Sequence, residues 1–102
     1  HPWLFRQELN AGDLRWLAGE PAGLVDGLEL QARIRHRHVP ALCRVQRLSG
    51  GQVQVRFDQA QRTPAPGQYV VFYRDDECLG GGVILEADAT VIAAAPVNLA
   101  TA

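Results

Sequence analysis

The chain has 102 residues, of which 47% are hydrophobic and 21% charged, and its formal net charge is −1. This length suits one small domain, and the composition is typical of a folded chain and excludes disorder of the whole. The charge excludes a strongly basic nucleic-acid binder of the histone kind, although a local basic face remains compatible with it. All ten Lys and Arg positions are arginine, which suits phosphate binding, but a coding preference for arginine explains the same count.

The two ends and the cysteines give little sign of chemistry. The chain contains no Met and begins at His1, without the pattern of a signal or transit peptide, so a processed N-terminus or an excised domain is expected. No apolar run approaches the ~20 residues that span a bilayer, and we expect a cytoplasmic protein with no membrane contact. Cys43 and Cys78 lie far apart in predicted strands, so we expect two free, buried thiols and no metal site.

The N-terminal segment allows two interpretations. Residues 3–9 form an extended run that ends in a turn cluster at 10–13. Residues 14–17 resume an apolar alternation, which the glycines and proline of 19–23 interrupt. The pattern fits two short strands or a strand followed by a helical turn, and it does not decide between them.

The strand signal is clearer from Leu28 onward. Alternation places one set of side chains on an apolar face and another set on a polar face. The apolar set is Leu30, Ala32, Ile34 and His36, and the polar set is Gln31, Arg33, Arg35 and Arg37. His36 is therefore expected to be a hydrogen-bonded core or rim residue rather than a catalytic base. Residues 42–48 and 52–57 alternate around Ser49-Gly50-Gly51, which predicts a β-hairpin with Cys43, Val45, Val53, Val55 and Phe57 facing inward.

The C-terminal half predicts a second hairpin and a tail. Pro66-Gly67 is typical of a type II turn, and residues 69–73 are apolar on both faces, as in a strand that is covered on both sides. The acidic residues 75–77 fit a solvated hairpin tip better than a metal or acid–base site. Gly80-Gly81-Gly82 precedes β-branched residues and lacks the partners of a phosphate loop, so we expect a bulge or a close strand crossing there.

Together these elements predict an all-β fold, a small antiparallel barrel of six to seven strands. We expect the barrel to occupy residues 1–86 and an Ala-rich tail to occupy 87–102, in which 90–94 could add an edge strand. The sequence has no GxSxG elbow, HExxH, P-loop or dinucleotide-binding motif. We therefore expect this chain alone to have no catalytic, metal or cofactor site.

One group of residues suggests a binding function. Arg33, Arg35 and Arg37, with His38 beside them, form a ladder along one strand face at a spacing of about 6.6–7 Å. That spacing is close to the phosphate spacing along a nucleic-acid strand, and it would suit contacts that do not depend on base sequence. The alternative is an ordinary solvated strand face that is partnered by acids on neighbouring strands.

A family resemblance rests on several segments in a fixed order. They are residues 13–21, 32–37, 39–40, 43–45, 55–58, 61–62, 66–73 and 76–84, within a region from about 3 to 86. The strongest are PGQYVVFY at 66–73 and DECLGGGVI at 76–84. In sequence and spacing they resemble the C-terminal domain of bacterial tRNA-specific 2-thiouridylases.

The resemblance implies a barrel akin to the second domain of translation elongation factors. It implies a longer enzyme that uses ATP and Mg²⁺ to adenylate the wobble uridine of certain tRNAs and then thiolates it. The implied partners are tRNA, the enzyme's N-terminal catalytic and central domains, and sulfur-donor proteins. The family's catalytic cysteines and SGGxDS-type loop belong to earlier domains, so Cys43 and Cys78 inherit no sulfur-transfer role. A role in tRNA contact carries over onto Arg33, Arg35 and Arg37, whereas the tail after Glu86 departs from the family.

Two other functions stay open. The barrel could be purely structural and pack on the catalytic domains without meeting RNA. Residues 66–70 also resemble the entry to the flavin-binding barrel of ferredoxin-reductase-like oxidoreductases, although residues 72–75 do not supply that family's Arg-x-Tyr-Ser/Thr strand.

Overall fold

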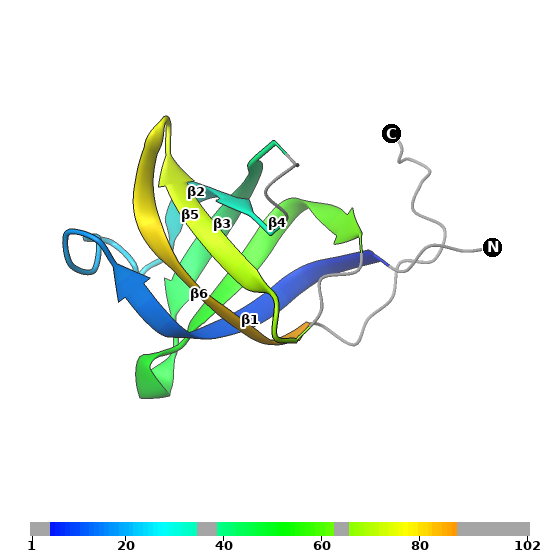
Figure 1. Cartoon of the computed structure of the whole chain (residues 1–102), viewed down its shortest axis with the longest axis horizontal. Coiled ribbons are helices and arrows are strands. Elements are labelled where there is room, and N and C mark those ends of the chain that lie inside the picture. The colour runs from blue at the N-terminus through cyan, green and yellow to red at the C-terminus, as the bar shows by residue number, and fades with distance from the viewer. Residues whose placement is uncertain (1–4, 35–38, 63–65, 88–102) are drawn as a thin grey trace.

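The computed structural model describes residues 5–34, 39–62 and 66–87, which form six β-strands and one short 3₁₀ turn (Figure 1). The strands are β1 (Phe5–Trp16), β2 (Leu28–Arg33), β3 (Ala41–Arg47), β4 (Val53–Arg62), β5 (Tyr69–Arg74) and β6 (Glu77–Ala87), and the 3₁₀ turn is Ser49–Gly51. No helix in these residues is long and apolar enough to cross a membrane. The tail strand expected at 90–94 lies outside the described residues.

The strands close into an antiparallel barrel in the order β1-β4-β3-β2-β5-β6. The ring closes because β1 pairs with β4 on one side and with β6 on the other. A closed sheet leaves no row of unpaired backbone amides and carbonyls, which would otherwise attract another strand. The predicted six- to seven-stranded antiparallel barrel is confirmed.

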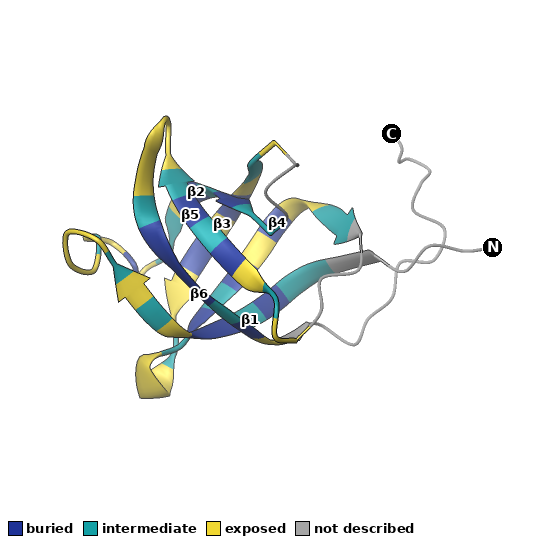
Figure 2. Ribbon diagram, viewed as in Figure 1, coloured by how far each residue is buried: buried dark blue, intermediate teal, exposed yellow. Residues whose placement is uncertain are grey.

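One face of each strand points into a common core. Buried and less buried residues alternate along the strands, most clearly along β5 (Figure 2). The buried hydrophobic residues are Leu9, Ala11, Leu24, Leu30, Ala32, Cys43, Val45, Val53, Val55, Phe57, Val70, Phe72 and Ile84. All five inward positions predicted for the first hairpin are among them. Leu24 belongs to the β1–β2 connection, and its carbonyl oxygen accepts a hydrogen bond from the Arg47 amide at 2.8 Å, which fixes that connection to the end of β3.

The N-terminal segment differs from both sequence interpretations. β1 is a single strand of 12 residues that runs through the predicted turn at 10–13. Asp13 adopts a φ of +48°, and the pairing between β1 and β6 shifts register between Gly12 and Arg15. The turn prediction was wrong because the turn-forming residues make a β-bulge, which bends a strand without ending it.

The predicted hairpins are present. β3 and β4 are joined by Ser49–Gly51, where Gly50 has a φ of +75°, and β4 continues to Arg62, beyond the predicted end of that strand. Asp75 and Asp76 form the tight connection between β5 and β6.

β5 does not meet the expectation of a strand covered on both sides. Its outer residues Val71 and Tyr73 are half-buried and Tyr69 is exposed, because this barrel supplies neighbours on the inner side only.

The glycine triplet lies within β6, where β1 crosses closely, as predicted. Gly80 has a φ of +143°, and a Cβ atom placed on it would collide with the carbonyl oxygen of Arg15 and lie 2.9 Å from Cα of Trp16. The pairing of β5 with β6 also shifts register between Phe72 and Tyr73. A glycine here combines a conformation that other residues rarely adopt with the space that β1 needs.

The two cysteines are both free but occupy different environments. Cys43 is buried in the core, whereas Cys78 is exposed, so the prediction of a buried thiol was wrong for Cys78. Cys78 lies opposite Tyr73 on the outer face. Strict alternation counted back from the buried Ile84 would turn Cys78 inward, but the register shift between the two residues places it on the other face. Burial, and to a smaller extent the charge of Asp58, raises the pKa of the Cys43 thiol from 9.0 to about 12. The thiol of Cys43 is therefore protonated and unreactive at neutral pH.

We predict that Gly80→Ala lowers the free energy of unfolding by roughly 3 kcal/mol or more, since it combines backbone strain with a collision against β1. Gly50→Ala is the matched control, because Gly50 also has a positive φ but nothing lies near its Cβ position. The control should lose only about 1–2 kcal/mol, the penalty of the backbone conformation alone. Urea unfolding of the three proteins measures both values, and equal losses would contradict the close crossing.

We predict that the Cys43 thiol makes stability fall in alkaline solution. The pKa of this thiol is higher in the folded chain than the value of 9.0 expected on unfolding. The contribution of the protonated thiol to the free energy of unfolding is therefore complete below pH 9 and is lost as the pH rises toward 12. The stability advantage over Cys43→Ala should be constant below pH 9 and then shrink by about 1.4 kcal/mol per pH unit. Unfolding curves of both proteins between pH 7 and 11 give this difference, which a pH-independent result would refute.

Candidate nucleic-acid interface

The outer face of four strands carries a row of charges that balance one another. Glu8, Arg56, Arg44 and Glu29 lie opposite one another in register across β1, β4, β3 and β2. Two arginines in directly opposite positions repel. Each therefore has an acid on its other side, with 3.0 Å between Arg56 Nη1 and Glu8 Oε2 and 3.8 Å between Arg44 Nη1 and Glu29 Oε2.

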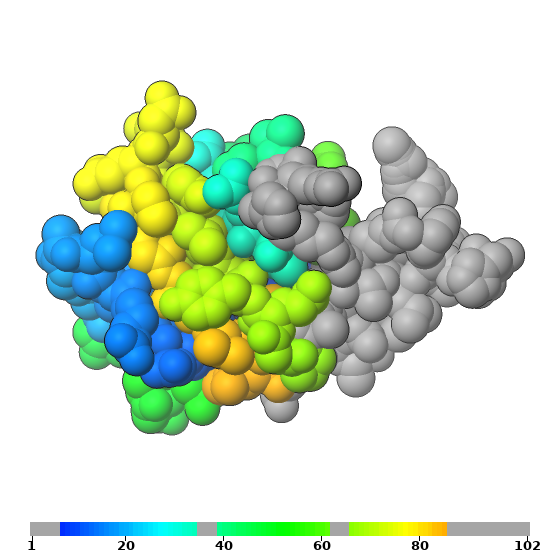
Figure 3. Space-filling view, in the orientation of Figure 1, coloured from blue at the N-terminus to red at the C-terminus, as the bar shows by residue number. Residues whose placement is uncertain are grey.

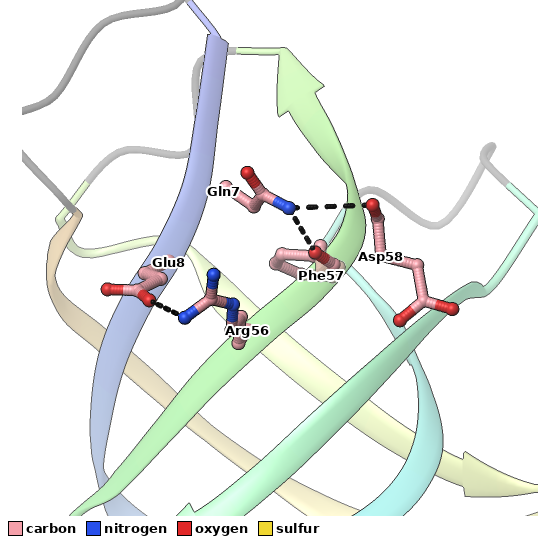
Figure 4. Close-up of polar contacts among 5 residues, drawn as sticks. All are labelled: Gln7, Glu8, Arg56, Phe57 and Asp58. Carbon is pink, nitrogen blue, oxygen red and sulfur yellow. Dashed lines mark hydrogen bonds and ion pairs between the residues drawn. The ribbon is translucent and has the colours of Figure 1, made fainter.

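A bulge in the pairing of β1 with β4 fixes the Glu8 end of this row. The register jumps between Arg6 and Glu8, so that residues 57–60 of β4 have no partner in the register with β1. The Gln7 side chain reaches across and donates its amide to the carbonyl oxygen of Phe57 at 3.0 Å, with a longer contact of 3.5 Å to that of Asp58 (Figure 4). Glu8 then lies beside Arg56, as the same view shows.

Two more arginines are neutralised by nearby acids. Arg47 places Nε and Nη2 at 3.1 and 2.6 Å from one carboxylate oxygen of Glu20. Arg15 lies 3.9 Å from Asp13, and both of these side chains are well exposed. Each pair is weak in its effect on stability. Each nevertheless offsets the positive charge that an approaching phosphate would meet.

Arg33 has a different environment. Its guanidinium donates a hydrogen bond from Nη2 to the Tyr73 hydroxyl oxygen at 2.5 Å, and its Cζ atom lies 5.2 Å from the centre of the Tyr73 ring. In the part of the chain that the structure describes, no carboxylate lies within 4 Å of Arg33. The guanidinium is half-buried and held by an aromatic ring, and its charge has no acidic partner there.

Arg74 is the other arginine without an ion pair among the described side chains. It is exposed, it lies opposite Glu77 in register, and it directly precedes Asp75 and Asp76. These three carboxylates offset its charge at longer range. Arg33 is therefore the stronger candidate for contact with an anion.

The structure brings Arg33 and Tyr73 together, but the remainder of the arginine ladder is not described. β2 ends at Arg33, Ile34 lies in a bend, and Arg35, His36, Arg37 and His38 are outside the described residues. The ladder beyond Arg33 stays a prediction. Sequence reasoning missed Tyr73 as its partner, because the pairing of β2 with β5 joins residues 40 positions apart. The alternation of Tyr69, Val71 and Tyr73 could have indicated that the Tyr73 ring faces outward.

The other sequence candidates show no assembled chemistry. The acidic tip at 75–77 is exposed, and no group of three or more His, Cys, Asp or Glu that could hold a metal ion occurs among the described residues. The glycine triplet lies inside a strand, where it cannot present the free amides of a helix N-terminus to a phosphate. A shallow pocket beside Tyr73 is also lined by Gln31, Leu42, Arg74 and Asp75, so its lining is of mixed charge.

Comparison with known proteins places this barrel in a family. The model of the aminomethyltransferase β-barrel domain matches residues 6–84. Two curated relatives, from Francisella tularensis subsp. novicida (strain U112) and subsp. tularensis (strain SCHU S4 / Schu 4), are each named tRNA-specific 2-thiouridylase MnmA. Each is 50% identical to this chain over 86 residues, which are 83% of this chain and 23% of the relative.

The chain thus spans about a quarter of the length of the curated relatives it matches. The resemblance to 2-thiouridylases that the ordered motifs indicated is confirmed. The matched region contains all six strands in whole or in large part. The chain belongs to the aminomethyltransferase β-barrel domain family.

Proposed function

We propose that this chain is the β-barrel domain of a tRNA-specific 2-thiouridylase and that it helps to bind or position tRNA without being catalytic itself. The observation that carries the proposal is the 50% identity, over 83% of the chain, to proteins with that name. In this proposal, thiolation of the wobble uridine, the use of ATP and Mg²⁺, and the exchange with sulfur-donor proteins belong to the N-terminal catalytic and central domains of a cytoplasmic enzyme.

The environment of Arg33 supports the contact with tRNA. A guanidinium group has five N–H donors, and the Tyr73 hydroxyl uses one of them. The remaining donors can bind phosphate oxygens, and the ring limits the conformational freedom that would be lost on binding. Arg44, Arg47 and Arg56 would first have to leave an acidic partner. Arg33 has no such partner among the described residues, so its charge is available to a phosphate.

The purely structural function is the second candidate, and one observation favours it. The outer faces of β5 and β6 expose apolar side chains, including Tyr69 and Leu85. Such side chains suit protein packing better than RNA backbone contact. The two functions are compatible, because they use different side chains of adjoining strands, and Arg33 lies opposite Val71 in register. No contact in the described residues favours the flavin-binding alternative, which a flavin absorption spectrum of the purified protein would revive.

We predict that Arg33→Gln weakens tRNA binding several-fold at low salt and lowers the slope of log affinity against log salt by about 1, as the loss of one phosphate contact requires. Titration of labelled tRNA at several salt concentrations measures both quantities. The matched control is Arg56→Gln, which removes the same formal charge from an arginine that Glu8 already neutralises.

The control should change affinity by less than about twofold. Equal effects of the two substitutions would show that only the net charge matters and would contradict a contact at Arg33. Where the separate barrel binds too weakly, the same pair of substitutions is compared in the longer enzyme, because linkage to its other domains raises the effective concentration.

A further inference from the structure

A group of uncharged side chains lies on part of the outer side of β5 and β6. It consists of Tyr69, Val71, Val83 and Leu85, and we refer to these four residues as the β5–β6 apolar face. Tyr69 and Leu85 are 46% and 43% exposed, and the two valines are half-buried. Tyr69 lies opposite Val83 in register, so the residues are neighbours across the two strands. Figure 3 shows β5 and the end of β6 side by side on the visible side of the molecule.

Two glycines make this face flat. A Cβ atom on Gly12 of β1 would lie 2.9 Å from Cδ1 of Leu85, and one on Gly81 of β6 would lie 3.0 Å from Cε2 of Tyr69. The Leu85 and Tyr69 side chains therefore lie across positions where a larger residue would push them outward. The result is a low apolar surface rather than separate projecting side chains.

The other described parts of the outer surface are different in character, and Arg33 of β2 lies opposite Val71 at the edge of the face. Four neighbouring strands carry the row of Glu8, Arg56, Arg44 and Glu29 on their outer sides. Other exposed large hydrophobic residues, Leu17, Val25, Val39 and Leu42, lie in connections or singly on β3. Single exposed hydrophobic residues are normal on a protein surface, whereas a contiguous uncharged group marks an interaction site.

We propose that the β5–β6 apolar face packs against the remainder of a longer polypeptide, on an apolar surface of its neighbouring domain. This inference rests on the proposed function. The chain spans 23% of the length of its relatives, so the remaining three quarters would be tethered to the barrel at high effective concentration. A flat apolar face suits such a permanent contact. RNA would require positive charge, which these four residues lack. The sequence of β5 agrees, because a strand that is apolar on both faces is typical of one covered on both sides.

The test compares thiol accessibility in the separate barrel and in the full-length enzyme that contains it. Leu85→Cys and Tyr69→Cys are introduced one at a time into a Cys78→Ser background, since Cys78 is exposed and Cys43 is buried. Leu42→Cys is the matched control, because Leu42 is 58% exposed on the outer side of β3. Alkylation is followed by mass spectrometry of the peptide that carries each substitution, and a thermal unfolding curve shows that each variant folds.

We expect the thiols at positions 85 and 69 to react about tenfold or more slowly in the full-length enzyme than in the separate barrel, because a stable intramolecular contact opens rarely. The Leu42→Cys thiol should react at the same rate in both. Equal rates at position 85 in the two proteins would overturn the proposal. Protection of the separate barrel by added tRNA would also overturn it and would assign the face to RNA. Protection that grows with the concentration of the separate barrel would overturn it too and would assign the face to a second copy.

This outcome is separable from the test of tRNA contact. If the thiols at positions 85 and 69 are protected but Arg33→Gln does not change tRNA binding, the docking face is supported and the contact of Arg33 with tRNA is contradicted. The barrel would then have a structural function. If Arg33→Gln weakens tRNA binding but the two thiols are not protected, the contact with tRNA is supported and the docking face is contradicted.

Discussion

Closure of the sheet through β1 is the constraint on which the other features of the barrel depend. β1 pairs with both β4 and β6, and it must bend sharply to do so. The bend uses the bulge at Asp13, and the crossing uses Gly80, where a Cβ atom would collide with the β1 backbone. A closed ring of short strands has one inside and one outside. Closure therefore divides the side chains of each strand into those that fill the core and those that form the outer surface.

The charged residues on the outer surface of the barrel differ in whether they have a partner of opposite charge. Glu8, Arg56, Arg44 and Glu29 form a neutral row, and Arg47 is held by Glu20. Against this background Arg33 is distinct, since its charge rests on an aromatic ring instead of an acid. Net charge cannot reveal this difference, because a chain of net charge −1 can still carry an arginine whose charge no described acid offsets within an ion pair.

The β5–β6 apolar face adjoins the side that carries Arg33, which lies opposite Val71 in register. A barrel that packs on its neighbour through β5 and β6 would hold Arg33 at a fixed place beside that interface. Rigid placement matters for a positioning domain, because an anion contact restrains a bound RNA only if the contact is itself restrained. The flatness that Gly12 and Gly81 give to the face is the feature that would make such packing reproducible.

The sequence by itself determined the strand class, the first hairpin with its inward residues from Cys43 to Phe57, and the role of the glycine triplet. Each of these depends on local alternation or on the conformational range of glycine. Tertiary structure decided that residues 10–13 bend a strand instead of ending it, because β1 pairs with β4 along one edge and with β6 along the other. It also placed Cys78 outside, since a one-residue register shift reverses the faces. The pairing of Arg33 with Tyr73, and the neutralisation of other arginines by acids far away in the chain, required the closed barrel, because sequence periodicity reports the face of a residue but not its neighbour across the sheet.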